Sequence, residues 1–166
     1  MALPLLAVAT RPAKLPAQQL VIRVCEGVSG LQITGPRAPG FVPVGFEQQR
    51  LARRRHAGHN ELLGKAVGWR EQRHPRVIDA TAGYGIDAFL LADLGCSVLL
   101  CERSPVMAVL LERALLRARS SDSSWLIAVQ SRLELHPGAA QTLAQEQLED
   151  AEVVYLDPMF PEARRG

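Results

Sequence analysis

Short apolar runs alternate with segments of helical periodicity through the second half of the chain, and few folds accommodate that order. The alternation is typical of a mostly parallel sheet with helices packed on both faces. The sequence therefore predicts an α/β fold. The expected strands are residues 77–79, 97–101, 132–136 and 153–156, and the expected helices are residues 87–94, a segment beginning at Pro105, and residues 139–148.

Two of the expected helices carry recognisable end signals. Gly95 follows the first one, and glycine is common just past a helix end because it accepts a left-handed conformation. Ser104 precedes the second as an N-cap, and Pro105 takes the first helical position, where its missing N–H costs nothing. The apolar stripe of that helix consists of Met107, Leu110, Leu111, Ala114, Leu115 and Ala118.

The first half of the chain differs in character, so we divide the chain into three parts. Residues 1–46 are rich in proline and glycine and predict a small β-rich lobe. Residues 47–75 predict a basic helical connector, and residues 76–166 form the α/β domain. The expected elements of the first two parts are strands at 20–24 and 31–34, a turn at 27–30, and helices near 48–55 and 60–67.

Composition narrows the class of protein. The chain is 48% hydrophobic and 22% charged, so it can bury a core. A net charge of +2 is too small to indicate nucleic-acid binding by itself. No apolar stretch is long enough to span a bilayer, and three cysteines without a CxxC pair are typical of core residues in a reducing cytoplasm. We expect neither a metal site nor a membrane contact.

Positive charge is concentrated in one segment of the connector. Three consecutive arginines cannot share one helix face, so at least one points outward. Such a run can contact RNA phosphates, or it can simply be a solvated helix face. The segment contains Arg50, Arg53, Arg54, Arg55, His56 and His59.

A glycine-containing turn follows the first strand of the α/β domain and reads DATAGYGID from Asp79. Gly83 and Gly85 would let the backbone pass close to a ligand, next to the free N–H groups of a helix N-terminus. Asp79, Gly83 and Gly85 are therefore candidate cofactor-binding residues. The third glycine of the dinucleotide fingerprint is missing, which disfavours a nicotinamide enzyme. An ordinary strand-to-helix turn is the alternative.

Glu102 directly follows the second strand, 23 positions beyond Asp79. In doubly wound folds an acidic residue about 20 positions beyond the glycine loop binds ribose hydroxyls, because a carboxylate accepts two hydrogen bonds at once. Alone, Glu102 would be interpreted as a surface residue. Together with the glycine loop it predicts a nucleoside-binding site.

The last expected strand ends in Asp157, followed by Pro158 and Phe160. A carboxylate there can accept a hydrogen bond from the exocyclic amino group of a nucleobase, and an aromatic ring can stack on that base. Asp157, Pro158 and Phe160 are therefore candidate catalytic residues. The alternative is a strand-terminal aspartate that caps a turn before proline.

The stretches DATAGYGIDAFLLADLGCSVLLCERSPVMAVLLERAL and VVYLDPMFP resemble the bacterial small-subunit ribosomal RNA guanine-N2 methyltransferases of the RsmJ family, over roughly residues 41–161. The resemblance implies a class I methyltransferase fold with a Rossmann-like sheet and S-adenosyl-L-methionine as cofactor. It also implies a guanosine of ribosomal RNA, naked or in the 30S subunit, as the cytoplasmic substrate. Carried over by position, the cofactor contacts are Ile86, Asp87, Glu102, Arg103, Ala139, Ala140 and Asp157.

The resemblance extends to the basic connector and also has limits. The family usually has arginine at the position of Ile86, and polar residues at those of Ala139 and Ala140. It continues past Gly166, so we expect C-terminal strands to be missing and the strand at 153–156 to form an open edge. The RNA-binding residues carried over are Arg53, Arg54, Arg55, His56 and Lys65.

Two other functions stay open at this point. A DNA or RNA amino-methyltransferase with a different substrate would carry a similar Asp157 segment. A truncated relic would bind cofactor or RNA without turnover.

Overall fold

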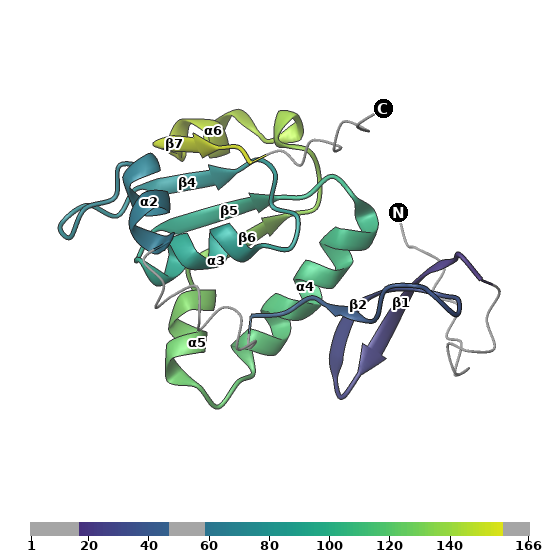
Figure 1. Cartoon of the computed structure of the whole chain (residues 1–166). Helices are drawn as coiled ribbons and strands as arrows, with labels where there is room; N and C mark the ends of the chain where they lie inside the picture. The colour runs from purple at the N-terminus through teal and green to yellow at the C-terminus, as the bar shows by residue number, and fades with distance from the viewer. Residues whose placement is uncertain (1–16, 47–58, 158–166) are drawn as a thin grey trace.

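The structure, a computed structural model, describes residues 17–46 and 59–157 of the 166-residue chain. These residues form a three-stranded sheet and a four-stranded sheet with its helices (Figure 1). Strands and helices alternate through residues 76–155, which confirms the α/β class.

The larger sheet is parallel throughout and has the order β6-β5-β4-β7. The chain moves from β4 to β5 and then to β6 on one side, and returns to the other side of β4 for β7. β7 therefore lies at an edge, as expected, and β4 lies beside the point where the strand order reverses. The strands are β4 (Arg76–Asp79), β5 (Ser97–Cys101), β6 (Leu133–His136) and β7 (Val153–Tyr155).

Helices cover both faces of this sheet. In Figure 1, α6 lies beside β7, away from α3 and α5. The right-handed rule for parallel crossovers explains the change of face, because the last connection runs in the opposite direction along the sheet. The helices are α2 (His59–Ala66), α3 (Ile86–Asp93), α4 (Pro105–Arg119), α5 (Ser124–Gln130) and α6 (Gln145–Asp150).

The main core lies between the sheet and the layer of α3, α4 and α5. The ring of Phe89 stacks on Phe46, with ring centroids 5.0 Å apart, and meets the edge of Trp125 at 5.6 Å. The Trp125 indole N–H also donates to Asp93 at 2.7 Å. Phe46 comes from the end of the N-terminal lobe, so the lobe and the α/β domain share one core.

The N-terminal sheet is antiparallel, with β1 (Leu20–Cys25) pairing β2 (Val28–Ile33) and β2 pairing β3 (Val42–Pro43). The expected turn at 27–30 is wrong, because the turn occupies only Glu26 and Gly27. Both have positive φ, 49° and 77°, as a two-residue hairpin of the favoured twist requires. Gly30 lies within β2, where a Cβ would lie 2.3 Å from the carbonyl oxygen of Val42.

The expected helix at 139–148 is also wrong. The chain forms a single 3₁₀ turn, η2 (Ala140–Thr142), and then α6. Leu143 and Ala144 have extended ψ values of 145° and 154° between the two. This break buries the Leu143 side chain against Ile78 and Cys101, and core burial outweighs the local helical preference.

The other expected elements agree with the structure. Ser104 accepts the N–H of Met107 at 3.5 Å and caps α4, as its position predicted. Helix α5 was missed because seven residues are too few for a clear period. Burial raises the pKa of Cys96 and Cys101 to about 11, so both are core thiols rather than nucleophiles. The expected helix at 48–55 lies outside the described residues.

The two glycines of the loop before α3 offer a matched test of packing. Both have positive φ, but a Cβ on Gly85 would lie 2.9 Å from Leu111 Cδ2, whereas one on Gly83 meets nothing closer than 3.7 Å. Gly83→Ala should cost roughly 1–2 kcal/mol of unfolding free energy for the conformation alone. Gly85→Ala should cost roughly 1–3 kcal/mol more from overpacking. Urea unfolding measures both, and equal losses would contradict the packing assignment.

Candidate functional site

Four strand ends meet along the carboxyl edge of the larger sheet. The N–H of Ala82 donates to the Cys101 carbonyl at 3.2 Å, and the N–H of Glu102 donates to the His136 carbonyl at 3.2 Å. The N–H of Ala80 donates to the Tyr155 carbonyl at 3.0 Å. Ligands of open α/β sheets bind outside the carboxyl ends of the strands, where the order reverses. In this sheet that position lies between β4 and β7.

The loop from Asp79 to Asp87, here called the donor loop, is held by its own carboxylate and by its neighbours. The N–H of Thr81 donates to Asp79 Oδ1 at 3.0 Å, which tightens the exit from β4. Gly85 has φ 70° and begins α3 as its N-cap. The loop thus brings the N-terminal end of α3 to the carboxyl edge of β4.

Glu102 binds two backbone N–H groups at once. Its Oε2 accepts the N–H of Gly83 at 2.9 Å, and its Oε1 accepts the N–H of Ser104 at 2.7 Å. The residue is 9% exposed, so it is buried and not the surface residue of the alternative interpretation. One carboxylate therefore ties the donor loop to the start of α4. Each oxygen keeps a second lone pair that can accept a further hydrogen bond.

Asp157 is exposed two residues after the end of β7, and its backbone N–H donates to the Thr81 hydroxyl at 2.8 Å. Thr81 thereby connects the donor loop to the start of the Asp157 segment. Thr81 was not among the residues predicted from sequence, since a threonine among alanines carries no chemical signal. Pro158 and Phe160 lie outside the described residues.

Tyr155 is a second residue that was not predicted from sequence. Its phenol donates to Asp87 Oδ2 at 3.0 Å, so β7 is also bonded to the first turn of α3. In the β4–β7 register Tyr155 lies opposite Asp79 and points to the same face of the sheet. The period-two alternation of β7 could have indicated that Tyr155 points inward, because it places Val153 and Tyr155 on the same face, against the core.

The site is electrostatically negative. Burial raises the pKa of Asp79 to about 6, and the N–H of Thr81 partly offsets this. The charges of Asp87, Asp157 and Glu102 also raise it. Burial and then the neighbouring Asp87 raise the pKa of Tyr155 as well, so its phenol stays protonated as a donor. A positively charged group would be stabilised among these carboxylates.

The remaining expected cofactor contacts lie around this edge. Ala139 and Ala140 follow β6, where the ring of His136 and the Thr142 hydroxyl are 2.8 Å apart and close the loop. Ala140 packs against the small core on the α6 side of the sheet. Ile86, the first residue of α3, packs against the main core and so presents no polar group. Arg103 is exposed between β5 and α4.

The structure does not bring Lys65 to this edge. Lys65 is exposed in the last turn of α2. The preceding Gly64 lies against Leu94, and Trp69 donates its indole N–H to the Leu94 carbonyl at 2.7 Å. Leu94 is the C-cap of α3, at the far end of that helix from the donor loop. Arg53, Arg54, Arg55 and His56 lie outside the described residues.

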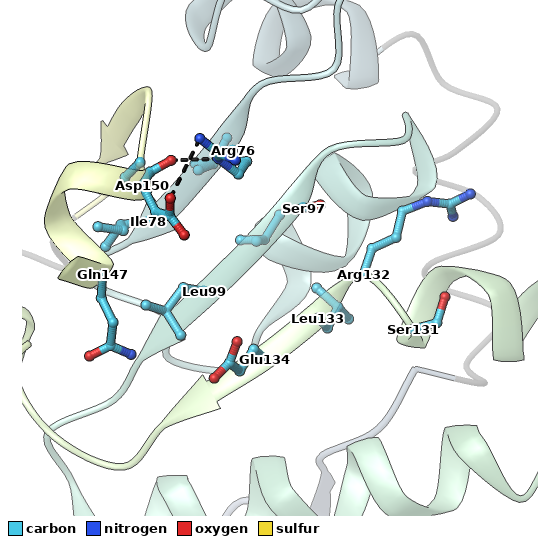
Figure 2. A pocket seen from close by; sticks show the side chains of 13 residues that line it. Arg76, Ile78, Ser97, Leu99, Ser131, Arg132, Leu133, Glu134, Gln147 and Asp150 are labelled. Atoms are coloured by element: carbon cyan, nitrogen blue, oxygen red, sulfur yellow. Dashed lines mark hydrogen bonds and ion pairs between the residues drawn. The ribbon is translucent and has the colours of Figure 1, made fainter.

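A hollow of about 350 Å³ lies on the face of the sheet and not at its carboxyl edge (Figure 2). It is lined from the amino ends of the strands, by Arg76 and Ser97, and from α6, by Gln147 and Asp150. The ion pair between Arg76 and Asp150, 3.7 Å apart, closes one side of it. None of the expected site residues within 59–157 lines this hollow, so it has no part in the candidate site.

Two classes of site are absent from residues 17–46 and 59–157. Within these ranges no helix has the length and apolar character to cross a membrane. In the same part of the chain no group of three or more His, Cys, Asp or Glu side chains is arranged to hold a metal ion.

Comparison with known proteins gives a consistent family. A family model described as "Putative SAM-dependent methyltransferase" matches residues 13–166. A solved structure of a SAM-dependent methyltransferase from Neisseria gonorrhoeae superposes with a TM-score of 0.73 at 32% identity, covering 89% of this chain and 60% of that one.

Curated relatives are similar over most of this chain. Ribosomal RNA small subunit methyltransferase J of Stutzerimonas stutzeri is 41% identical over 152 residues, which is 90% of this chain and 58% of the relative. The protein of the same name from Pseudomonas paraeruginosa is 47% identical over 139 residues, which is 81% of this chain and 53% of the relative. The chain thus spans little more than half the length of these relatives.

The raised pKa of Asp79 predicts how the free energy of unfolding depends on pH. The folded pKa of about 6 exceeds the ordinary 3.8, so Asp79 favours folding below pH 4 and this contribution is lost as pH rises through 6. Asp79→Asn keeps the oxygen that accepts the Thr81 N–H but never ionises. The variant should be more stable than the wild type at pH 8, by on the order of 1–3 kcal/mol.

Urea unfolding of both proteins between pH 4 and pH 8 measures this difference. The gap should close as pH falls toward 4, because the folded wild-type carboxyl is then protonated. Titrating groups that do not interact with Asp79 are common to the two proteins and cancel. A gap that does not change with pH would show that the pKa of Asp79 is the same in the folded and unfolded states.

Proposed function

The chain belongs to the SAM-dependent methyltransferase family, and on that premise we propose that it methylates the exocyclic N2 amino group of a guanosine in small-subunit ribosomal RNA. The names of the curated relatives support ribosomal RNA as the substrate class. The resemblance of the LDPMFP segment supports N2 of guanine as the acceptor. We also propose that the protein acts in the cytoplasm, on naked RNA or on the 30S subunit.

The residues at the carboxyl edge suit S-adenosylmethionine. The space beside Gly83 is open, because an added Cβ would meet no atom closer than the Thr81 carbonyl at 3.7 Å. Glu102 has lone pairs left for a vicinal diol after binding its two N–H groups. S-adenosylmethionine carries positive charge, which matches the carboxylates of Asp79, Asp87 and Asp157.

Each group of residues then has a distinct part. Gly83, Glu102 and the loop after β6 hold the nucleoside, and Asp87 holds a charged part of the donor. S-adenosylmethionine supplies an electrophilic methyl group: N2 bonds to the methyl carbon, the C–S bond breaks with its electron pair left on sulfur, and N2 loses one proton. The Asp157 carboxylate accepts a hydrogen bond from the N2 amino group and then takes up the proton that N2 loses. Its charge counters the weak nucleophilicity of a conjugated amine.

The bond between Asp157 and Thr81 is the observation that carries the proposal. The backbone N–H of Asp157 donates to the hydroxyl of Thr81, a residue of the donor loop. Asp157 is therefore held beside the donor loop by a direct contact rather than through distant packing. Methyl transfer depends on such positioning, because the two reacting groups must approach in line.

Asp157→Ala tests the catalytic assignment. The substitution should lower methyl transfer by ~10²–10³-fold, the usual cost of removing one positioned electrostatic group. Affinity for S-adenosylmethionine should fall much less, since Gly83 and Glu102 remain. Transfer of labelled methyl groups to small-subunit RNA measures the first effect, and calorimetry measures the second.

The matched control is Glu146→Ala, which removes an exposed carboxylate from the first turn of α6. It should leave both quantities unchanged. A wild-type chain that methylates DNA but not small-subunit RNA would overturn the substrate class. A wild-type chain that binds the donor without transferring methyl groups to any RNA would overturn the activity.

The cluster Arg53-Arg54-Arg55 should contact RNA phosphates. Replacing all three with glutamine should weaken RNA binding and reduce its salt dependence, by a slope of about 0.7–0.9 for each phosphate that is no longer neutralised. Titrations at several salt concentrations measure the slope. Replacing the exposed Arg37, Arg70 and Arg119 instead gives the same change of net charge. Equal slopes for the two triple variants would favour a merely solvated helix face.

A further inference from the structure

The bond between Tyr155 and Asp87 joins two parts of the molecule that are 68 residues apart in the chain. Tyr155 is the last residue of β7, and Asp87 lies in the first turn of α3. The phenol oxygen and Asp87 Oδ2 are 3.0 Å apart, and the pair is partly buried. The bond therefore lies between the strand that leads to Asp157 and the helix that follows the donor loop.

The hydroxyl of Tyr155 is not needed to fill space. The ring of Tyr155 packs against the main core, and a phenylalanine ring would fill the same volume. A partly buried hydroxyl lowers the stability of the fold unless it forms a hydrogen bond. The difference between tyrosine and phenylalanine at this position is therefore the hydrogen bond that the hydroxyl makes. Its acceptor is a carboxylate, and hydrogen bonds to charged acceptors are the stronger kind.

A hydrogen bond from the Tyr155 hydroxyl affects the orientation of the Asp87 carboxylate. Asp79 and Asp157 lie close enough to act on the same groups, and repulsion between carboxylates favours turning Asp87 away from them. A hydrogen bond to Oδ2 opposes that rotation and fixes the plane of the carboxylate. Burial and the neighbouring charges raise the pKa of Tyr155, so the phenol donates at every physiological pH.

We propose that Tyr155 is a positioning residue of the donor site, which acts through Asp87 by holding its carboxylate in one orientation toward S-adenosylmethionine. The inference rests on the proposed function, in which Asp87 is a cofactor contact. Because Tyr155 lies two residues before Asp157, the same bond also joins the end of β7 to the first turn of α3. Thr81 forms the second such connection, through the Asp157 N–H.

A double-mutant cycle on donor affinity tests the inference. Tyr155→Phe removes only the hydroxyl and should weaken binding of S-adenosylmethionine by about 10- to 150-fold, the range for losing a hydrogen bond to a charged group. Asp87→Ala should also weaken it. In the Asp87→Ala background, Tyr155→Phe should change the affinity by less than about twofold, because the hydroxyl then has no carboxylate to hold. Calorimetry on the full chain gives all four constants.

The cycle separates positioning from general loosening of the fold. A role of the hydroxyl that does not run through Asp87 would weaken binding by the same factor with or without Asp87, and that result would overturn the inference. Ser131→Ala is a matched control, since it deletes another hydroxyl bond, to the Ala128 carbonyl at 2.9 Å, away from the site. It should leave donor affinity unchanged, and an equal loss there would also count against Tyr155.

The outcome for the wild-type chain distinguishes this inference from the proposed function. If the wild type binds S-adenosylmethionine and Tyr155→Phe binds equally well, only the role of Tyr155 fails. If the wild type binds the donor but transfers no methyl group, the proposed activity fails and the cycle still decides the role of Tyr155. If the wild type does not bind S-adenosylmethionine, both fail together.

Discussion

The reversal of strand order beside β4 is the constraint on which the site depends. Since β5 pairs one side of β4 and β7 pairs the other, Asp79 at the end of β4 has strand ends on both sides. The loop that leaves β4 leads to α3 on one face of the sheet, whereas the chain that leaves β6 leads to α6 on the other face (Figure 1). Asp79, Asp87 and Asp157 are close enough at this edge for the charges of the other two to act on Asp79. A ligand site at that edge follows from topology before any particular residue is considered.

Gathering carboxylates in one place has an energetic cost, and the structure offsets it with backbone N–H groups. Thr81 donates to Asp79, and Gly83 and Ser104 donate to Glu102. The offset is incomplete at Asp79, whose pKa stays at about 6, mainly because the side chain is buried and then because Asp87, Asp157 and Glu102 repel its charge. A cationic ligand would relieve the remaining repulsion. The free protein is therefore less stable than it could be at neutral pH, and donor binding recovers part of that difference.

The sequence predicted those features that local patterns determine. Apolar stripes, Ser104 and Gly95 located α4 and the end of α3, and the glycine spacing with Glu102 located the donor loop. Features that depend on distant residues were not predictable. Tyr155 and Asp87 are 68 residues apart, and nothing in either segment indicates the other. The helix expected at 139–148 failed for the same reason, because burial of Leu143 on the sheet decides where that segment bends.

Glu102 shows why the sequence and the structure assign different roles to the same residue. Its position after β5 predicted a ribose contact, which requires accessible oxygens. In the structure both oxygens already bind backbone N–H groups, so the side chain also fixes the donor loop and the start of α4. Removing it would expose two N–H groups and loosen both segments along with any ribose contact. A lower donor affinity in a Glu102 variant therefore does not measure the strength of one contact, whereas Tyr155→Phe removes one hydroxyl bond to Asp87 and leaves every backbone N–H group paired as before.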